Sequence, residues 1–543
     1  MVFARRSTTL LAAIIASCAM VLSLTACTSD NKTVVDGQTT VTSNSAGGVA
    51  VFTPSDGITL NQQMPLNKWA KLVPDLTKAL VDAGFKKGDI NHTTSDSLAK
   101  QSRAIQDFVV DHLSNNTTDD SGIAIAPDNM TLLVAPVVEA DASTRQYGDY
   151  VSQNLSTNDV TDEGATSDGE SSEDDSSKDD SSNTESDSTA SDEQAQAVDR
   201  LVSSLKLAKE SGMHVVLLGN SIEGYKPDAF VKFSDAQTIG KLQAEKMVSK
   251  LKLDKASKDN PKYIEVLLPY TAVDEKGNAN DSTFAQEAFR GIWQVLGSYY
   301  QKGVVESPSG TLDGKSTEND WQAVAYDAAK EGSTAKVLDK RLAKTDGQST
   351  LTRIDGIITM NDYIASEVVK ELDDLGYTGS AADINPQITI SGIVGNITGK
   401  KDLSRDAVPD PIKSPENDNA NDSSSSDDDA DEDTSASDKD RDSQWPLVTG
   451  YGAYVSNIPS IVNGKQWMTG MEDRQTIATD IAQACAKLNK DEALNSMPSI
   501  RSSEVGGVKK IPTISEPLLA VSASNLKSAL IDPGYISLAD AGL

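Results

Sequence analysis

The sequence predicts an α/β protein with two doubly wound lobes, each built on a parallel sheet that helices cover on both faces. Short apolar runs alternate along the chain with longer segments whose apolar residues recur at helical spacing. The apolar runs are continuous, as in parallel strands that are buried on both faces. The chain has 543 residues, which is enough to bury two cores.

Four elements are predicted in the first 130 residues. The apolar run at 49–53 (VAVFT) indicates a buried strand. Apolar residues at helical spacing predict a helix over 69–83, which Gly84 ends, and a second helix over 97–113. The run at 122–126 (GIAIA) is predicted to be the next strand.

The middle of the chain continues the alternation. A helix is predicted over 198–210, followed by a strand at 214–218 (HVVLL). A helix over 235–251, a strand at 263–268 and a helix over 282–300 come next. Each of these strands is a short apolar run, and each helix carries an apolar stripe.

The last predicted elements point to where function should lie. Residues 321–330 and 336–341 are predicted to be helical, 355–360 (DGIITM) a strand, 363–375 a helix and 447–450 a strand. Ligand sites of parallel α/β folds lie beyond the carboxyl ends of the strands. The polar residues that directly follow each predicted strand are therefore the candidates for function.

The N-terminus is typical of an exported protein. Arg5 and Arg6 precede an apolar stretch at 10–24, which is too short to span a bilayer comfortably. These features predict a signal peptide over residues 1–26. Residues 27–48 are polar and predict a flexible tether.

The end of the signal peptide reads LTAC at residues 24–27 and resembles the lipobox of bacterial lipoproteins. This resemblance implies that Cys27 becomes the lipidated N-terminus and anchors the protein to the extracytoplasmic face of the cell membrane. The alternative is an ordinary signal peptide with a chance cysteine.

No disulfide, metal site or cofactor is expected in the mature chain. Cys18 leaves with the signal peptide, Cys27 is the lipid site, and Cys485 stands alone. The three histidines are scattered along the sequence and do not form a zinc-ligand pattern.

The net charge of −32 is concentrated in two tracts. Residues 151–197 hold 14 acidic residues and one lysine, and residues 403–444 hold 14 acidic and four basic residues. Both tracts are nearly free of large apolar residues, so they are predicted to be disordered inserts. Neither has the spacing of a calcium loop, and the lack of a basic patch excludes a nucleic-acid partner.

A resemblance to a known family extends over residues 49–543. It is carried by Lys68-Trp69 at the start of the first helix and by the segments 231–244, 278–291, 359–365, 448–454 and 510–543. In their order and wording these segments resemble the type 1 periplasmic binding proteins, in particular the xylose and multiple-sugar-binding branch of ABC-transporter solute receptors.

This resemblance implies two α/β lobes that are joined by three crossing segments and close on a ligand like a hinge. Lobe one is expected to comprise 49–219 and 361–450, including both acidic inserts. Lobe two is expected to comprise 220–360 and 451–543.

A sugar receptor needs an aromatic face for the pyranose ring and polar groups for the hydroxyls. Trp69 fits the first role by position, and a core residue on the helix stripe is the alternative. The other candidate ligand-binding residues, matched by position or chemistry, are Lys68, Asp128, Asn220, Asp235, Asn280, Asp281, Asn361, Asp362 and Tyr451. Asp and Asn at such positions are also favoured as helix N-caps and turn residues.

The chain departs from the family pattern at three places. Asn220-Ser221 stands where the branch has Asp-Arg, Ser234 replaces an Asp, and Tyr451-Gly452 replaces Gln-Asp. Each lost charged hydrogen bond costs about 1.5–3 kcal/mol. Either the ligand differs and stacks on Tyr451 and Tyr454, or sugar binding is lost.

The expected function is a membrane-anchored solute-binding protein that delivers a sugar-like molecule to an ABC permease, as a monomer and without chemistry of its own. The alternative is a surface sensor or docking lipoprotein with altered or lost sugar binding. An enzyme is disfavoured because the sequence has no G-x-S-x-G elbow and no phosphate-binding glycine loop.

Overall fold

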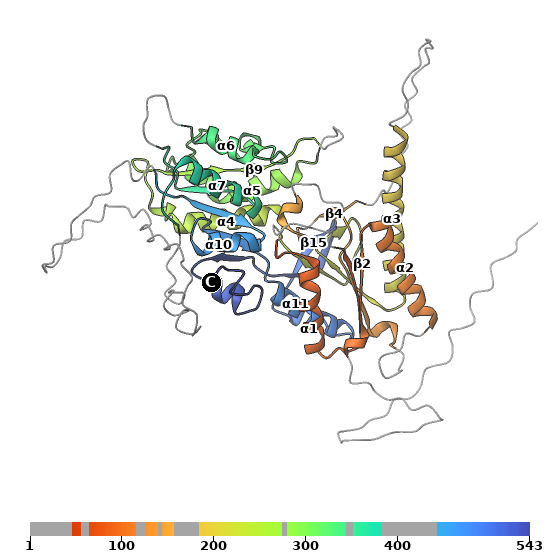
Figure 1. The fold of residues 1–543 in the computed structure, drawn as a ribbon. Helices are drawn as coiled ribbons and strands as arrows, with labels where there is room; N and C mark the ends of the chain where they lie inside the picture. Colours follow the sequence, from red (N-terminus) through yellow and green to blue (C-terminus); the bar gives the residue numbers. More distant parts are fainter. Residues whose placement is uncertain are drawn as a thin grey trace, which may run out of the picture. The chain divides into compact units, whose positions relative to one another are not determined.

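Two parallel sheets with flanking helices organise the chain from residue 46 onward (Figure 1). The computed structural model describes residues 46–55, 65–115, 125–138, 144–151, 153–156, 184–273, 280–343, 351–381 and 443–543. The predicted signal peptide, Cys27 and the tether up to residue 45 lie outside these residues, as do most of the two acidic tracts, whereas Gly48, the last residue of the predicted tether, begins the first strand. No helix in the described ranges is long and apolar enough to cross a membrane.

Sheet one has seven strands in the order β15-β16-β7-β5-β3-β1-β2. Along the chain these are β1 (Gly48–Pro54), β2 (Ile90–Ser95), β3 (Met130–Val134), β5 (His214–Leu218), β7 (Ala229–Lys232), β15 (Ile500–Val505) and β16 (Val508–Ser515). All neighbours are parallel except β15, which runs antiparallel to β16.

Sheet two has six strands in the order β10-β8-β12-β13-β14-β17. They are β8 (Lys262–Val266), β10 (Val305–Glu306), β12 (Gly356–Ile358), β13 (Leu447–Tyr451), β14 (Met468–Met471) and the antiparallel β17 (Leu519–Ser522). If the first five strands of each sheet are numbered 1 to 5 in sequence order, their order across the sheet is 2-1-3-4-5 in both sheets. This doubly wound order occurs twice, which confirms the predicted fold class.

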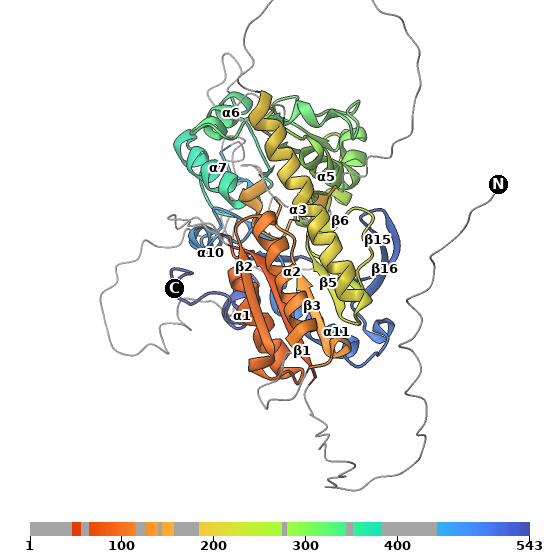
Figure 2. The ribbon, with the colours of Figure 1, turned by 90° about the vertical axis from the view of Figure 1, so that its right-hand side faces the viewer.

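Helices cover both faces of each sheet. On sheet one, α1 (Trp69–Asp82) and α11 (Arg474–Leu488) pack on one face, and α2 (Leu98–Asn115) and α3 (Thr184–Glu210) on the other. Successive strand residues point to opposite faces, so Val49 and Val51 meet α1 while Ala50 and Phe52 meet α2. Figure 2 shows α2 and α3 side by side.

Sheet two is covered in the same way. Helices α4 (Ala236–Lys250) and α5 (Thr283–Gln301) lie on one face, and α6 (Ser333–Arg341) and α7 (Asp362–Leu375) on the other. The smaller elements include β4 (Asn154–Leu155) paired with β6 (Ser221–Ile222), β9 (Leu268–Pro269) paired with β11 (Ala325–Tyr326), and α10 (Ile458–Val462).

Within the part of the chain that the structure describes, the backbone crosses between the sheets at three places. Residues 233–235 lead from β7 to α4, residues 472–473 from β14 to α11, and residues 516–518 from β16 to β17. The three crossing segments that the resemblance implied are therefore present.

The predicted lobe boundaries need correction. Strand β13, predicted in lobe one, pairs with β12 and β14 in sheet two. Strand β7, predicted in lobe two, pairs with β5 and β16 in sheet one. The physical reason is that β12, α7 and β13 form one parallel crossover unit, which keeps α7 and β13 on the sheet of β12.

Several predicted elements also differ. The strand expected at 122–126 is β3, at Met130–Val134, and all five of its residues are buried. The expected helix at 321–330 is a short 3-10 turn (Asp320–Ala323) followed by β11. Strand β2 was missed because it lies at the edge of sheet one and is mostly polar and exposed.

The first acidic tract is shorter than predicted. Its last residues, from 184 to 197, belong to α3, and its first residues contain β4. Ala197 and Val198 are buried against sheet one. Helix-forming Ala, Glu and Gln residues lead into this packed turn, so the tract continues the helix instead of interrupting it.

Candidate functional site

The carboxyl ends of strands from both sheets meet at one place, which we call the junction (residues 66–69, 233–234, 361–362, 451–454 and 472). The backbone amide of Leu66, before α1, donates to the carbonyl of Gly452, after β13, at 2.9 Å. The hydroxyls of Ser234 and Tyr451 lie 2.5 Å apart. The edges at which ligands bind in doubly wound sheets are therefore in direct contact.

Sheet one contributes an aromatic cluster to the junction. Trp69, at the start of α1, is 2% exposed, and its ring centroid lies 5.1 Å from that of Tyr150 and 5.7 Å from that of Phe233. The ring edge also packs on Gly219, whose φ of +70° favours glycine. Trp69 is thus buried in an aromatic cluster of sheet one, and its contact with a ligand stays a prediction.

Sheet two contributes Tyr451, the last residue of β13. Its hydroxyl donates to Glu472 Oε1 at 3.2 Å, and the same oxygen accepts from the Ser234 amide at 2.6 Å. Burial raises the pKa of Glu472 to about 7. A carboxyl group that can be neutral at physiological pH therefore ties two crossing segments together.

Asn361 links α7 to the junction. Its Oδ1 accepts from the Ile364 amide at 2.9 Å as an N-cap, and its Nδ2 donates to Gln146 Oε1 at 3.1 Å. The residue before it, Met360, has a φ of +69°, and Ala453, after β13, has a φ of +51°. Such left-handed backbone in residues other than glycine is typical of functional sites.

Asp362 is completely buried next to the junction. Its Oδ2 accepts from the Tyr454 amide at 2.9 Å and from Thr469 Oγ1 at 2.8 Å, while Oδ1 accepts from Gln466 Nε2 at 2.7 Å. Burial raises its pKa to about 6. With its oxygens bonded inside sheet two, Asp362 ties the loop after β13 to β14 and to the residues just before it.

Lys68 and Asn220 contact the connection between β3 and α3. Lys68 Nζ lies 2.8 Å from Asp149 Oδ1. Asn220 follows β5; its Oδ1 accepts from the Gln153 amide at 3.0 Å, and its Nδ2 donates to the Pro136 carbonyl at 2.9 Å.

Three more candidates serve as caps or turn residues. Asp235 caps α4 through the Thr238 amide at 2.7 Å. Asn280 Nδ2 donates to the Thr271 carbonyl at 2.8 Å, and Asp281 Oδ1 accepts from the Thr283 amide at 3.0 Å. Contact between these residues and a ligand stays a prediction.

Asp128 lies elsewhere. It is exposed in the 3-10 turn Pro127–Asn129, which precedes β3. Its placement in the site depended on the strand predicted at 122–126. Because β3 begins at Met130, Asp128 lies at the amino edge of sheet one, and that placement is wrong.

The comparisons with known proteins concern the fold. No protein-family model matches the chain, and no curated protein matches it. An ABC transporter solute-binding protein from Clostridium phytofermentans, with β-D-glucose bound, is 17% identical over 91% of this chain and 99% of its own, with a TM-score of 0.45. A carbohydrate transporter solute-binding protein from Chloroflexus aurantiacus, in complex with D-glucose, is 18% identical over 92% and 98%, with a TM-score of 0.43. A periplasmic ribose ABC transporter protein from Conexibacter woesei is 13% identical over 90% and 96%, with a TM-score of 0.42.

These similar structures are sugar-binding proteins of ABC transporters. None of them is described as a xylose receptor. At these identities the likeness concerns the fold alone, and the fold of this chain is defined by its own strand order.

Sequence reasoning missed several residues in the junction or packed against it. Phe233 and Glu472 belong to crossing segments, Phe284 lies in the first turn of α5, and Tyr147 and Tyr150 come from the β3–α3 connection. A usable signal was present at 146–150, where the sequence QYGDY places two aromatic residues directly before the acidic tract. An aromatic pair there is unexpected in a solvated insert.

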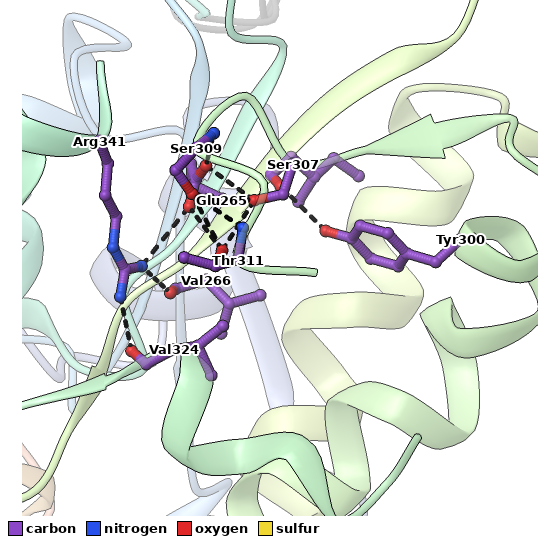
Figure 3. A network of polar contacts seen from close by, with 9 residues as sticks. Glu265, Val266, Tyr300, Ser307, Ser309, Thr311, Val324 and Arg341 are labelled. Carbon is purple, nitrogen blue, oxygen red and sulfur yellow. Dashed lines mark hydrogen bonds and ion pairs between the residues drawn. The ribbon is translucent and has the colours of Figure 1, made fainter. Parts of the chain in front are cut away.

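A second polar cluster lies within sheet two, away from the crossings (Figure 3). Glu265 on β8 is fully buried, and its Oε1 accepts from Ser307 Oγ at 2.7 Å and from the Ser309 amide at 2.8 Å. Arg341, at the end of α6, lies 3.5 Å from Glu265 Oε2 and donates to the carbonyls of Val266 and Val324. The cluster connects α6 to β8 and to the residue before β11, and its role is structural.

The described residues give little support for a metal site or a reactive cysteine. No group of three or more His, Cys, Asp or Glu side chains there could hold a metal ion. Cys485 is buried in α11, and burial raises the pKa of its thiol, which disfavours the reactive thiolate.

Proposed function

We propose that this chain is an extracytoplasmic solute-binding protein of an ABC-type uptake system, and that it binds a sugar or sugar-like polar solute at the junction. The observation that carries the proposal is the convergence of the carboxyl ends of two identically wound sheets on one cluster of aromatic and polar side chains. The three crossing segments allow the two sheets to part and close around a solute.

The chemistry of the junction suits a polar ring. Trp69 and Phe233 from lobe one, and Tyr451 and Phe284 from lobe two, offer aromatic faces for the apolar side of a pyranose. Lys68 and Asn361 are donors for hydroxyl oxygens. We assign no chemical step to these residues, and the solute is bound and released unchanged.

Membrane attachment is part of the proposal and rests on the sequence. Cys27 in the LTAC motif would carry the lipid, and the polar residues after it would space the binding domain from the membrane. Replacing Cys27 by Ser is expected to move the protein from the membrane fraction to the soluble exported fraction. Retention in the membrane fraction would contradict lipidation at this residue.

A second candidate function is a surface sensor or docking lipoprotein with altered or lost sugar binding. It is favoured by the side chains that already occupy the junction, since Lys68 is paired with Asp149 and Asn361 with Gln146.

A thermal-shift screen against monosaccharides, oligosaccharides and other polar metabolites tests the proposal. A solute that binds only the folded state raises stability by about 2.7 kcal/mol at a hundredfold excess over its dissociation constant. We expect a clear rise in melting temperature with at least one sugar-like solute. No shift across the panel, in a cooperatively folding protein, would favour the docking function.

A further inference from the structure

The connection between β3 and α3, residues 135–183, is unusually long for a doubly wound fold. Connections between a strand and the next helix in such folds run about 2–6 residues, and much longer ones are commonly functional. Residues 144–151, which include a 3-10 turn (Thr144–Tyr147), do not run over the outer surface. Thr144, Tyr147, Tyr150 and Val151 are buried, and the segment touches both lobes.

The contacts with lobe one are aromatic and ionic. The ring of Tyr150 stacks on Phe233 at 4.8 Å and meets Trp69 edge-on at 5.1 Å, and its hydroxyl donates to the Lys68 carbonyl at 2.5 Å. Asp149 Oδ1 pairs with Lys68 Nζ at 2.8 Å, and Oδ2 accepts from the Trp69 amide at 3.1 Å. A carboxylate at the first turn of α1 is also favoured by the helix dipole.

The backbone of the segment approaches lobe one closely. The Asp149 amide donates to the Asn67 carbonyl at 2.8 Å. Gly148 has a φ of +96°, and a Cβ there would lie 2.6 Å from the Asn67 carbonyl oxygen. Glycine is therefore required for the fit.

The segment contacts lobe two mainly through residues at or after the ends of its strands. Gln146 Oε1 accepts from Asn361 Nδ2 at 3.1 Å, and the Gln146 carbonyl accepts from the Tyr454 hydroxyl at 2.7 Å. The ring of Tyr147 lies 4.7 Å from that of Phe284 and 6.3 Å from that of Tyr451.

We infer that residues 144–151 are an internal occupant of the solute site, which must leave before a solute can bind. The inference rests on the proposed function, because the segment occupies the groups assigned there to the solute: Lys68, Trp69, Phe233, Phe284, Asn361 and Tyr451. Because the segment contacts both lobes, it holds them together as a bound ligand would. The apparent affinity for solute is then reduced by the fraction of molecules in which the site is vacant.

Hydrogen exchange of the complete chain without added solute is the first test. We expect the amides of residues 146–151 to exchange at least tenfold more slowly than in an unstructured peptide of the same sequence. Exchange at the unstructured rate would overturn the inference, whatever the protein binds.

The second test compares solute affinity in the native chain and in a Tyr147→Ala/Tyr150→Ala variant, whose changes lie on the segment. D-Glucose, D-xylose and myo-inositol are the probes, and calorimetry is the readout. We expect the variant to bind at least one probe tenfold or more tightly than the native chain does. Asp149→Ala, which removes the pairing with Lys68 but no aromatic ring, is expected to give a smaller gain and covers the case in which the double variant does not fold.

Tyr299→Ala is the matched control, because Tyr299 lies on the outside of α5 and bonds to Asp254. It is expected to leave the affinity unchanged. Equal affinities in the native chain and in both segment variants would overturn the internal occupant and leave the proposed function standing. No binding of any probe by any form would contradict the proposed function, and the inference would fall with it.

Discussion

Glu472 is the side chain through which the two lobes are coupled most directly. It lies in one crossing segment, accepts from the backbone of Ser234 in another, and accepts from the last residue of β13. Burial, the largest cause, raises its pKa to about 7 from the ordinary value of 4.5. The folded protein therefore keeps a proton that the unfolded chain releases as the pH rises above about 4.5.

The raised pKa of Glu472 determines how the stability of the protein changes with pH. Stability that depends on the protonated Glu472 is fully present below about pH 4.5 and is lost as the pH rises through about 7. Asp362, with a pKa raised to about 6, acts in the same direction. Between pH 5 and pH 8, we expect the free energy of unfolding to fall less in Glu472→Gln than in the native chain. The difference between the two decreases is expected to be up to about 3 kcal/mol.

Denaturant unfolding across this pH range measures the effect. Glu245→Gln, at a half-exposed position on α4, is the control and should keep the native pH profile. If the free energy of unfolding changed with pH equally in Glu472→Gln and in the native chain, Glu472 would be ionised in the folded protein over this whole pH range.

Positions in the junction were predictable where a family position and an element end coincide. Lys68 and Asn361 directly precede helices, Trp69 is the first residue of α1, and Tyr451 ends β13. Asp128 failed because its strand was misplaced by several residues. Asp235 and Asn280 show the competing preference of Asp and Asn for caps and turns.

Among the elements, α6 is held to sheet two by the buried pair of Arg341 and Glu265 (Figure 3). Removing one partner leaves a buried charge without compensation. We expect Arg341→Met to destabilise lobe two by about 3–5 kcal/mol in thermal or denaturant unfolding.

A surface pair provides the comparison for Arg341. Arg290 bonds to Glu287 on α5 and is partly exposed, so Arg290→Met is expected to cost at most about 1 kcal/mol. Equal costs for the two substitutions would show that the Arg341 pair is not a structural tie.

The last part of the first acidic tract, from residue 184 to residue 197, belongs to helix α3. Replacing residues 161–183 by a short Gly/Ser linker is expected to shift the melting temperature by no more than a few degrees, since loop length has a weak effect on stability. Removing 151–197 instead should destabilise lobe one strongly, because Val151, Leu155 and Ala197 are buried. Equal melting temperatures for the two deletions would contradict the packing of Ala197 in α3 against sheet one.

Elements were predictable where an apolar run is buried on both faces. Strands β5, β8, β12 and β13 all lie within two residues of their predicted bounds. The edge strand β2 and the antiparallel strand β15 carry too many polar residues for the same pattern to reveal them, and β17 is only four residues long. The lobe boundaries could not be read from local pattern, because they depend on which sheet each crossover returns to.

At the scale of the whole molecule, the same strand order occurs in both sheets, and the chain crosses between them three times. This topology brings the carboxyl ends of nonadjacent strands to one junction, as the family resemblance implied. Its particular feature is the aromatic segment at 144–151, which contacts both lobes at once. The solute site and its internal occupant would then share one set of side chains.

The most direct test of solute binding at the junction is calorimetric titration of the best solute from the screen into Asn361→Ser. Serine keeps the N-cap of α7 but removes the amide donor of Asn361. Asn525→Ser, in the turn after β17 and not among the candidate ligand-binding residues, is the matched control. The account predicts at least a tenfold loss of affinity for Asn361→Ser and little change for the control. Unchanged affinity in Asn361→Ser would place the solute away from the junction and contradict the proposed site.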